Sequence, residues 1–305
     1  MELSEAYREC ERITWTQARN FAYGIRLLPP HKRRGLAVLY AFARRIDDIG
    51  DGDLPAGQKI AELEQARRSV LSLDEQDGTD PVLLALADTK RNFPLVPIEA
   101  FGELIDGCVA DVRGTRYETF EDLHHYCRCV AGSVGRLSLG IFGTRGDQAE
   151  AVKLSDDLGV ALQLTNILRD IREDYGNGRI YLPAEDLAKF GVEGADLGGS
   201  DPPQTPPAHG GAARPPIPPG PPGPELIRLV EFEVERARDW YAIGWKLLPM
   251  LDRRSAACTG AMAGIYRRLL EQIAADPAAV LTRRVSLSPQ QKLTVAVKAL
   301  AGRFR

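Results

Sequence analysis

The amino-acid sequence predicts an all-α protein of eight or more helices. Apolar residues recur at helical spacing through most of the 305 residues. Strand signals are nearly absent, because no stretch shows sustained alternation of apolar and polar residues and no Asn-Gly or Asp-Gly hairpin joins two β-branched runs. Two stretches also space polar residues three and four apart among apolar ones, which places them on one face of a helix.

Proline and glycine divide the N-terminal half into helices. The first helix is expected over residues 4–26, with Ser4 as its N-cap and with Pro29 and Pro30 ending it. The basic cluster at residues 31–34 opens the next helix, which carries one of the two polar stretches and ends in a glycine-containing turn. Three further helices are expected over residues 56–73, 82–92 and 97–112.

A long helix is expected over residues 120–143. It contains Gly132 and Gly135, although glycine costs about 1 kcal/mol relative to alanine inside a helix. These glycines therefore predict a close approach, made either by a neighbouring helix or by a ligand. The second polar stretch forms the next helix, and the remaining helices are expected over residues 225–250, over residues 255–275 and after Pro289.

Residues 201–224 have a different composition from the rest of the chain. They hold 11 of the 21 prolines, with glycine and alanine filling much of the remainder, so they can neither form a helix nor bury a core. We expect a disordered surface loop here, inserted at about residues 195–224.

One polar stretch consists of Gln163, Asn166, Asp170 and Asp174. Leu164, Ile167, Leu168 and Ile171 lie between them, so the rest of this helix should be buried. Unpaired buried carboxylates are costly, and we therefore expect these four side chains to face a cavity that holds a cation.

The other polar stretch consists of Tyr40, Arg44, Asp47 and Asp51. Facing each other, the two helices would form an all-oxygen site with four carboxylates. Such a site suits Mg²⁺, which joins carboxylates to phosphate oxygens, whereas zinc or copper would require His or Cys. Arg44 and Arg169 can pair with phosphate, so the implied ligand is a magnesium-bound diphosphate. The alternative is that each acidic pair is a solvated helix face.

Composition excludes several classes of protein. A formal net charge of −3 gives no general attraction to nucleic acid. The acidic start lacks the basic and apolar regions of a signal peptide, and no apolar run is long enough to span a bilayer. Five cysteines without zinc-like spacing fit a reducing compartment. We expect a cytoplasmic protein that is either free or peripheral to a membrane.

Four segments resemble the signature segments of the squalene and phytoene synthase family. They are D-D-I-G-D at residues 47–51, Y-C-R-C-V-A-G-S-V-G at 126–135, Q-L-T-N-I-L-R-D-I-R-E-D at 163–174 and R-I-Y-L-P at 179–183. The resemblance covers nearly the whole chain apart from the proline-rich segment. It implies the isoprenoid synthase fold, with residues 1–305 forming a single helical domain around a central cavity.

The resemblance also implies roles for individual residues. The magnesium ligands would be Asp47, Asp51, Asp170 and Asp174, together with Asn166. Tyr126 would lie near the reacting carbons. Other positions that match substrate-binding or diphosphate-binding residues of the family are Phe21, Tyr40, Arg44, Gln163, Asn166, Arg169, Tyr181, Tyr266 and Arg284.

Members of this family join two prenyl diphosphates head to head. The segments around residues 18–29 and 111–123 most resemble the bacterial hopanoid-pathway enzymes that make presqualene diphosphate from two farnesyl diphosphates. The alternatives are a phytoene synthase that uses two geranylgeranyl diphosphates, a squalene synthase that also uses NADPH, and a non-catalytic helical assembly protein. Chain length, use of NADPH and oligomeric state stay open.

Overall fold

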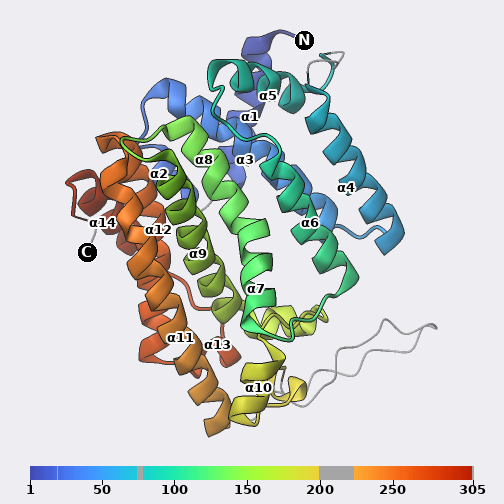
Figure 1. The fold of residues 1–305 in the computed structure, drawn as a ribbon, viewed down its shortest axis with the longest axis vertical. Helices are drawn as coiled ribbons and strands as arrows, with labels where there is room; N and C mark the ends of the chain where they lie inside the picture. Colours follow the sequence, from blue (N-terminus) through green and yellow to red (C-terminus); the bar gives the residue numbers. More distant parts are fainter. Residues whose placement is uncertain (19, 74–77, 199–222, 304–305) are drawn as a thin grey trace.

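The computed structural model describes residues 1–18, 20–73, 78–198 and 223–303, and all of the regular elements in these ranges are helical. The predicted all-α fold is therefore confirmed. Helices α12, α9, α8 and α6 lie side by side (Figure 1). In this view the N-terminus lies at the upper end, the C-terminus lies at the left beside α14, and the short α10 lies at the lower end. None of the described helices is both long and apolar enough to cross a bilayer.

The N-terminal residues form two helices where one was expected. Helix α1 (Leu3–Gln17) ends at Ala18, and the separate short helix α2 (Phe21–Ile25) follows. Helix α2 packs closely on α12, since a Cβ built on Gly24 would lie 2.7 Å from the backbone oxygen of Cys258. The expectation of one helix over residues 4–26 was therefore wrong, because this packing requires the chain to change direction.

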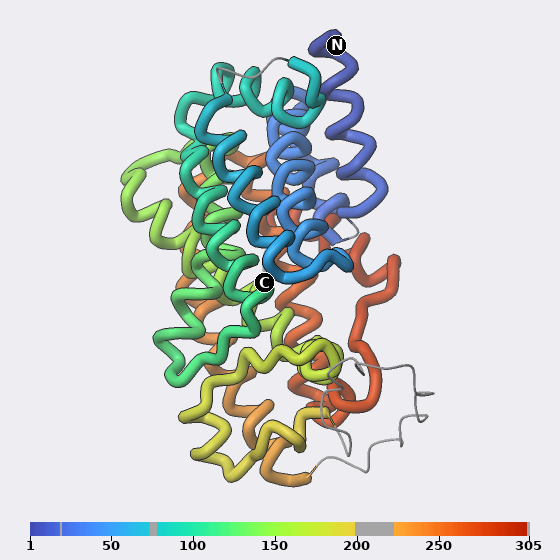
Figure 2. The backbone as a smooth tube through the Cα atoms, turned by 90° about the vertical axis from the view of Figure 1, so that its right-hand side faces the viewer, coloured from blue at the N-terminus to red at the C-terminus, as the bar shows by residue number. Residues whose placement is uncertain are grey.

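Helix α3 (Pro30–Asp51) begins at the second of the two prolines that were expected to stop a helix. Proline is well suited to the first helical turn, where its missing N–H has no intrahelical partner. The next helices are α4 (Ala56–Leu71), α5 (Pro81–Asn92) and α6 (Ala100–Arg113), close to their predicted ranges. Figure 2 shows α4 and α6 lying side by side along one face of the molecule.

The long helix expected over residues 120–143 contains a change of helical type. It consists of α7 (Phe120–Cys127), a π-helical turn (Arg128–Gly132) and α8 (Ser133–Phe142). A Cβ built on Gly132 would lie 2.7 Å from Asp156 Oδ1, and one built on Gly135 would lie 2.7 Å from Ser155 Oγ. Both contacts are with the neighbouring helix α9, so these glycines serve helix packing.

Helix α9 (Gln148–Gly176) is the central helix and contacts α7, α8, α11, α12 and α13. Two short elements that were not predicted follow it, α10 (Ala184–Phe190) and a 3₁₀ helix (Gly194–Leu197). The C-terminal elements are α11 (Pro224–Gly244), a 3₁₀ helix (Trp245–Met250), α12 (Arg253–Ala275), α13 (Ala279–Thr282) and α14 (Pro289–Leu300).

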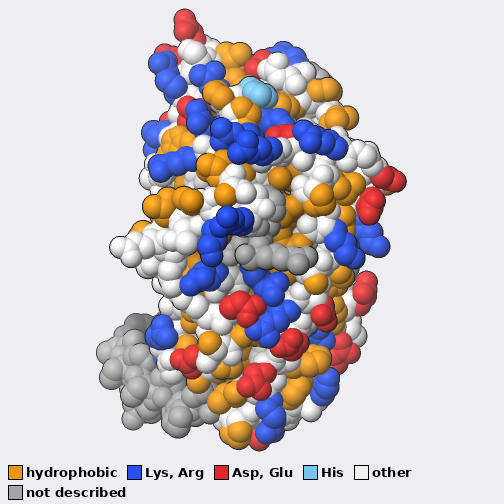
Figure 3. All heavy atoms as spheres, turned by 90° about the vertical axis from the view of Figure 1, so that its left-hand side faces the viewer, with side chains coloured by type: hydrophobic (Ala, Val, Ile, Leu, Met, Phe, Trp, Pro, Cys, Tyr) orange, Lys and Arg blue, Asp and Glu red, His pale blue; other side chains and the backbone are white. Residues whose placement is uncertain are grey.

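Most of the predicted proline-rich insertion, residues 199–222, lies outside the described residues. Its described edges are helical, because Leu197 is buried at the end of a 3₁₀ helix and Pro224 begins α11. Nearly all of the buried apolar side chains in the described ranges belong to one large cluster. On the surface, Lys and Arg side chains gather over the upper half of the face shown in Figure 3, so charge is unevenly distributed despite the small net value.

Candidate functional site

A cavity of about 340 Å³ lies between α3, α6, α8, α9 and α12. Along α3 its lining runs from Leu36 to Asp47, which at the rise of an α-helix is about 16 Å. Polar groups gather at one end, where the lining includes Arg44, Asp47, Asp111, Tyr126, Gln163, Asn166 and Tyr266. The other end is apolar and includes Leu36, Leu39, Leu137, Leu139, Phe142, Leu158 and Leu247.

The structure brings eight of the predicted site residues into the lining of this cavity. These residues are Phe21, Tyr40, Arg44, Asp47, Tyr126, Gln163, Asn166 and Tyr266. The others lie beyond its polar end, on or after the final turns of α3 and α9 or near α13. They are Asp51, Arg169, Asp170, Asp174, Tyr181 and Arg284.

One carboxyl group on α3 and one on α9 have strongly raised pKa values. Burial raises the pKa of Asp47 to about 7, against the lowering effect of Arg44 and with a further increase from Asp51. Burial also raises the pKa of Asp174 to about 7, and the neighbouring Asp170 carboxylate adds to this increase. Burial therefore disfavours the ionised form of one carboxyl group on α3 and one on α9, and a nearby cation would favour that form.

Arginines pair with the two remaining carboxylates. Arg179 lies 3.2 Å from Asp51, while Arg284 Nε lies 3.3 Å from Asp170 and Arg169 Nε donates to the same carboxylate at 2.8 Å. Among the described residues, no three His, Cys, Asp or Glu side chains converge on a possible metal position. Asp51 and Asp170 thus have arginine partners in the structure, and the role of the four carboxylates as magnesium ligands stays a prediction.

The residues at the polar end nevertheless fit Mg²⁺ held together with a diphosphate. Asn166 Oδ1 is buried without a hydrogen-bond partner, and so is Arg44 Nε. An orphaned amide oxygen can bind a hard cation, and an orphaned guanidinium N–H can donate to a phosphate oxygen. Asp47 and Asp174 supply further oxygen donors that burial has left in need of a cation.

Asp111 is a central residue of the site that sequence reasoning missed. Its carboxylate accepts hydrogen bonds from Tyr126 at 2.9 Å and from Tyr181 at 2.8 Å. Burial raises the pKa of Asp111, although the Tyr181 hydroxyl and Arg179 lower it. A signal was present in the sequence, because Leu104 and Cys108 precede Asp111 by seven and three residues and so share its helix face.

Three tyrosine rings pack together beside this carboxylate. The ring centroids of Tyr117 and Tyr126 are 5.3 Å apart, and those of Tyr126 and Tyr181 are 5.2 Å apart. The Tyr117 hydroxyl is buried and has no hydrogen-bond partner, and sequence reasoning did not select this residue. Of these three rings, that of Tyr126 lines the cavity, so its electron-rich face is the aromatic wall that could stabilise a carbocation there.

A second aromatic wall of the cavity is formed by Phe21, Tyr40 and Tyr266. The rings of Phe21 and Tyr266 stack with centroids 5.8 Å apart, and the Phe21 ring lies 6.5 Å from that of Tyr40. Phe21 begins α2, so the break after α1 is what brings its ring to α3 and α12.

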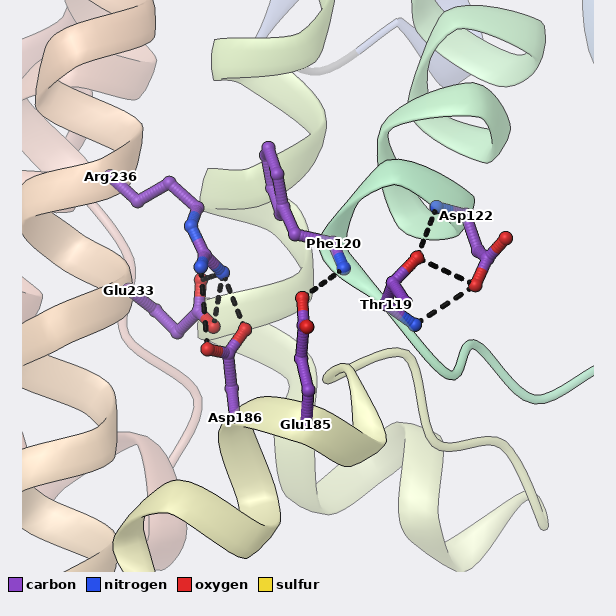
Figure 4. Close-up of polar contacts among 7 residues, drawn as sticks. All are labelled: Thr119, Phe120, Asp122, Glu185, Asp186, Glu233 and Arg236. Carbon is purple, nitrogen blue, oxygen red and sulfur yellow. Dashed lines mark hydrogen bonds and ion pairs between the residues drawn. The ribbon is translucent and has the colours of Figure 1, made fainter.

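The segment that carries Arg179 and Tyr181 leads into α10, which is fastened on two sides. The backbone N–H of Ala184 donates to the Tyr117 carbonyl at 2.9 Å. The Glu185 carboxylate accepts from the Phe120 N–H at 2.6 Å (Figure 4). These bonds join the start of α10 to the start of α7.

The opposite side of α10 is tied to α11. Arg236 pairs with Asp186 at 2.7 Å and with Glu233 at 2.8 Å, and both carboxylates are almost fully buried (Figure 4). Burial raises the pKa of Glu233 to about 8, against the lowering effect of Arg236. The position of Tyr181 therefore depends on contacts with two helices that are distant in the sequence.

Comparison with known proteins places the chain among enzymes of isoprenoid metabolism. The family model described as squalene/phytoene synthase matches residues 15–291. The chain is 48% identical over 302 residues to the phytoene synthase of Mycobacterium tuberculosis, an alignment that covers 98% of this chain and 92% of that protein. It is 32% identical to the 15-cis-phytoene synthase of Synechococcus elongatus, with coverage of 95% and 91%.

Solved structures show the same fold. A dehydrosqualene synthase in complex with a ligand superposes with a TM-score of 0.82 at 29% identity, covering 98% of this chain and 97% of that one. The squalene synthase HpnC from Alicyclobacillus acidocaldarius superposes with a TM-score of 0.73 at 31% identity, covering 89% and 94%. The helices thus form the isoprenoid synthase fold, and the chain belongs to the squalene/phytoene synthase family of prenyltransferases.

Proposed function

We propose that this protein condenses two prenyl diphosphates head to head and that its substrate is geranylgeranyl diphosphate, which would make it a phytoene synthase. The observation that carries the proposal is the division of one cavity into two parts. Its polar end offers the unpartnered Arg44 Nε and Asn166 Oδ1, and the rest of its lining is mainly apolar, with Ser138, Ser155 and Thr259 as the exceptions. An amphipathic substrate with a diphosphate head and a hydrocarbon tail matches this division.

The diphosphate would be held at the polar end of the cavity. Arg44 and Arg169 offer planar guanidinium groups, and Arg284 reaches the same region through Asp170. Asp47, Asp51, Asp170 and Asp174, together with Asn166, would hold Mg²⁺, which when bound acts as a Lewis acid on the departing diphosphate. The arginines then stabilise the negative charge that grows on the leaving group.

The aromatic walls act on the other product of that ionisation. Once the carbon–oxygen bond breaks, an allylic cation remains, and the ring faces near Tyr126 and Phe21 can stabilise it electrostatically. The apolar lining excludes water, which would otherwise capture the cation. Asp111 holds the hydroxyls of Tyr126 and Tyr181 in place beside the cavity by accepting a hydrogen bond from each.

Substrate length separates the two candidate reactions. The relatives that are 48% identical are named phytoene synthase, which supports geranylgeranyl diphosphate over the farnesyl diphosphate that the sequence segments favoured. Condensation of two farnesyl diphosphates to presqualene diphosphate is the second candidate. The superposition on the HpnC squalene synthase supports it. Use of NADPH stays open, and a cytoplasmic location, free or at a membrane surface, is part of the proposal.

The test is product analysis by mass after incubation with Mg²⁺ and either substrate, with and without NADPH. Phytoene from geranylgeranyl diphosphate is the expected product, whereas presqualene diphosphate or squalene from farnesyl diphosphate would favour the second candidate. The variants Asp47→Asn and Asp170→Asn should each lose activity about a hundredfold or more while their circular dichroism stays native. No product from either substrate would contradict the proposal.

A further inference from the structure

The apolar end of the cavity is closed by a polar cluster that the proposed chemistry does not use. Lys32 Nζ donates to the Phe142 carbonyl at 2.5 Å, to Asp252 Oδ2 at 2.7 Å and to Ser255 Oγ at 3.2 Å. Only 16% of the Lys32 side chain is exposed. This cluster joins the beginning of α3, the end of α8 and the beginning of α12, so three helices that line the cavity are fixed to one another there.

Phe142 and Leu36 form the inner surface of this closure. Both side chains line the cavity, and both are buried, with 6% of each residue exposed. Leu36 lies one helical turn beyond Lys32, and Lys32 holds the carbonyl of Phe142 itself. The turn after α8 is held as well, because the Arg145 N–H donates to the Met250 carbonyl at 2.6 Å.

This closure lies opposite the diphosphate end. The α3 residues that line the cavity extend from Asp47 and Arg44 to Leu36. With the diphosphate at Arg44 and Asn166, a hydrocarbon tail that follows this lining would run toward Leu36 and Phe142. A wall held by hydrogen bonds resists displacement more than one held by apolar packing alone, since moving Phe142 would break the hydrogen bond between its carbonyl and Lys32.

We propose that Phe142 and Leu36, held in place by Lys32, set the longest prenyl chain that the enzyme accepts. The proposal rests on the proposed function, because it assumes that a prenyl diphosphate occupies the cavity. Lys32 is in this view a positioning residue, since it acts on the substrate through Phe142.

The first test compares kcat/KM for farnesyl, geranylgeranyl and geranylfarnesyl diphosphate. Phe142→Ala should raise the kcat/KM for geranylfarnesyl diphosphate relative to that for geranylgeranyl diphosphate by about tenfold or more. The reason is that the substitution opens space for added methylene groups. Leu36→Phe should shift preference toward farnesyl diphosphate. The matched control is Ile141→Ala, because Ile141 is equally buried beside Phe142 but does not line the cavity, and its ratios should equal those of the native enzyme.

The second test addresses Lys32. Lys32→Met keeps the length of the side chain but removes its three hydrogen bonds, so it should shift the ratio in the same direction as Phe142→Ala. Lys32→Arg keeps the charge and the donors and should restore native ratios. Unchanged ratios in Lys32→Met would overturn the positioning role, and a shift in Phe142→Ala no larger than in Ile141→Ala would overturn the chain-length limit. A native enzyme that converts none of the three substrates would instead refute the proposed function.

Discussion

Asp111 accepts hydrogen bonds from two tyrosine hydroxyls at the polar end of the cavity. A buried carboxylate depends on such donors, because removing one partner leaves part of its charge without compensation. The adjacent Tyr117 hydroxyl offers a contrast, since it is buried and has no hydrogen-bond partner. The hydroxyls that donate to Asp111 and the hydroxyl of Tyr117 therefore differ in what they contribute to stability.

Tyr181→Phe should lower the free energy of unfolding by about 1–3 kcal/mol, because it leaves the buried Asp111 carboxylate with one fewer donor. Tyr117→Phe is the matched control and should be neutral or slightly stabilising, since its hydroxyl is already unpaired. Urea unfolding followed by circular dichroism measures both values. Equal destabilisation by the two variants would contradict the assigned hydrogen bond.

The ionisation of Asp252 makes the stability of the protein depend on pH. Contacts with Lys32, with the Ser255 hydroxyl and with the Ser255 N–H lower the pKa of Asp252 despite its partial burial. A lowered pKa in the folded state means that ionised Asp252 stabilises the protein above its unfolded pKa of about 3.9, and this contribution disappears as pH falls through the folded pKa.

The stability difference between the native protein and Asp252→Asn should therefore stay constant from pH 7 to about pH 5 and should narrow below about pH 4. Urea unfolding of both proteins across this range measures the difference. A gap that widens on acidification would show that the Asp252 carboxylate is not held ionised by these contacts.

At the scale of the helices, glycine sets how closely the π-helical turn and α9 approach each other. A Cβ built on Gly159 would lie 2.7 Å from the backbone carbon of Ala131. Gly176, at the end of the same helix, has no heavy atom within 4 Å of its Cβ position. The place of a glycine in the sequence of α9 thus does not show whether a close helix contact requires it. The atoms around its Cβ position in the folded structure do show this.

Gly159→Ala should destabilise the protein by about 1–3 kcal/mol, because the methyl group must push two backbones apart and this outweighs the higher helix propensity of alanine. Gly176→Ala should instead leave stability unchanged or raise it by up to about 1 kcal/mol. Thermal and urea unfolding of the two variants provide the comparison. A neutral Gly159→Ala would mean that the helices can separate at little cost.

At the scale of the whole molecule, the site joins helices from both halves of the chain. Asp47 belongs to α3 and Asp174 to α9, and the pKa of each is raised by burial. A ligand that binds the carboxylates of both helices finds them together only in the folded state. Its binding should therefore stabilise the entire fold by mass action. This expectation does not depend on turnover.

Mg²⁺ together with inorganic pyrophosphate should raise the Tm, with a gain of about 2.7 kcal/mol in unfolding free energy at a hundredfold excess over Kd. Mg²⁺ alone or pyrophosphate alone should raise the Tm less. Mg²⁺ alone would leave the arginines without an anion, and pyrophosphate alone would leave the carboxylates without a cation. Differential scanning calorimetry measures the shift, and Asp47→Asn with Asp170→Asn is the control in which it should largely vanish. An equal shift in that double variant would place the binding elsewhere.

Local geometry explains how much of this protein could be predicted from its sequence. Helical spacing alone aligned Asp47, Gln163 and Asn166 with the cavity, because the position of a side chain around a helix depends only on its place in the chain. The same periodicity predicted most of the helices. Short elements such as α10 and α13 were missed, because their stability comes from tertiary contacts such as those of Arg236 with Asp186.

Contacts between distant parts of the chain were decided only by the tertiary structure. Arg179 meets Asp51 across 128 residues, and Lys32 meets Asp252 across 220. The packing of helices sets which of many possible partners a side chain reaches, and no local pattern encodes it. The sequence therefore determined the all-α class and the chemistry of the two acidic helices, whereas the placement of Asp111, the arginine pairing of the carboxylates and the closed end of the cavity follow from how the helices pack.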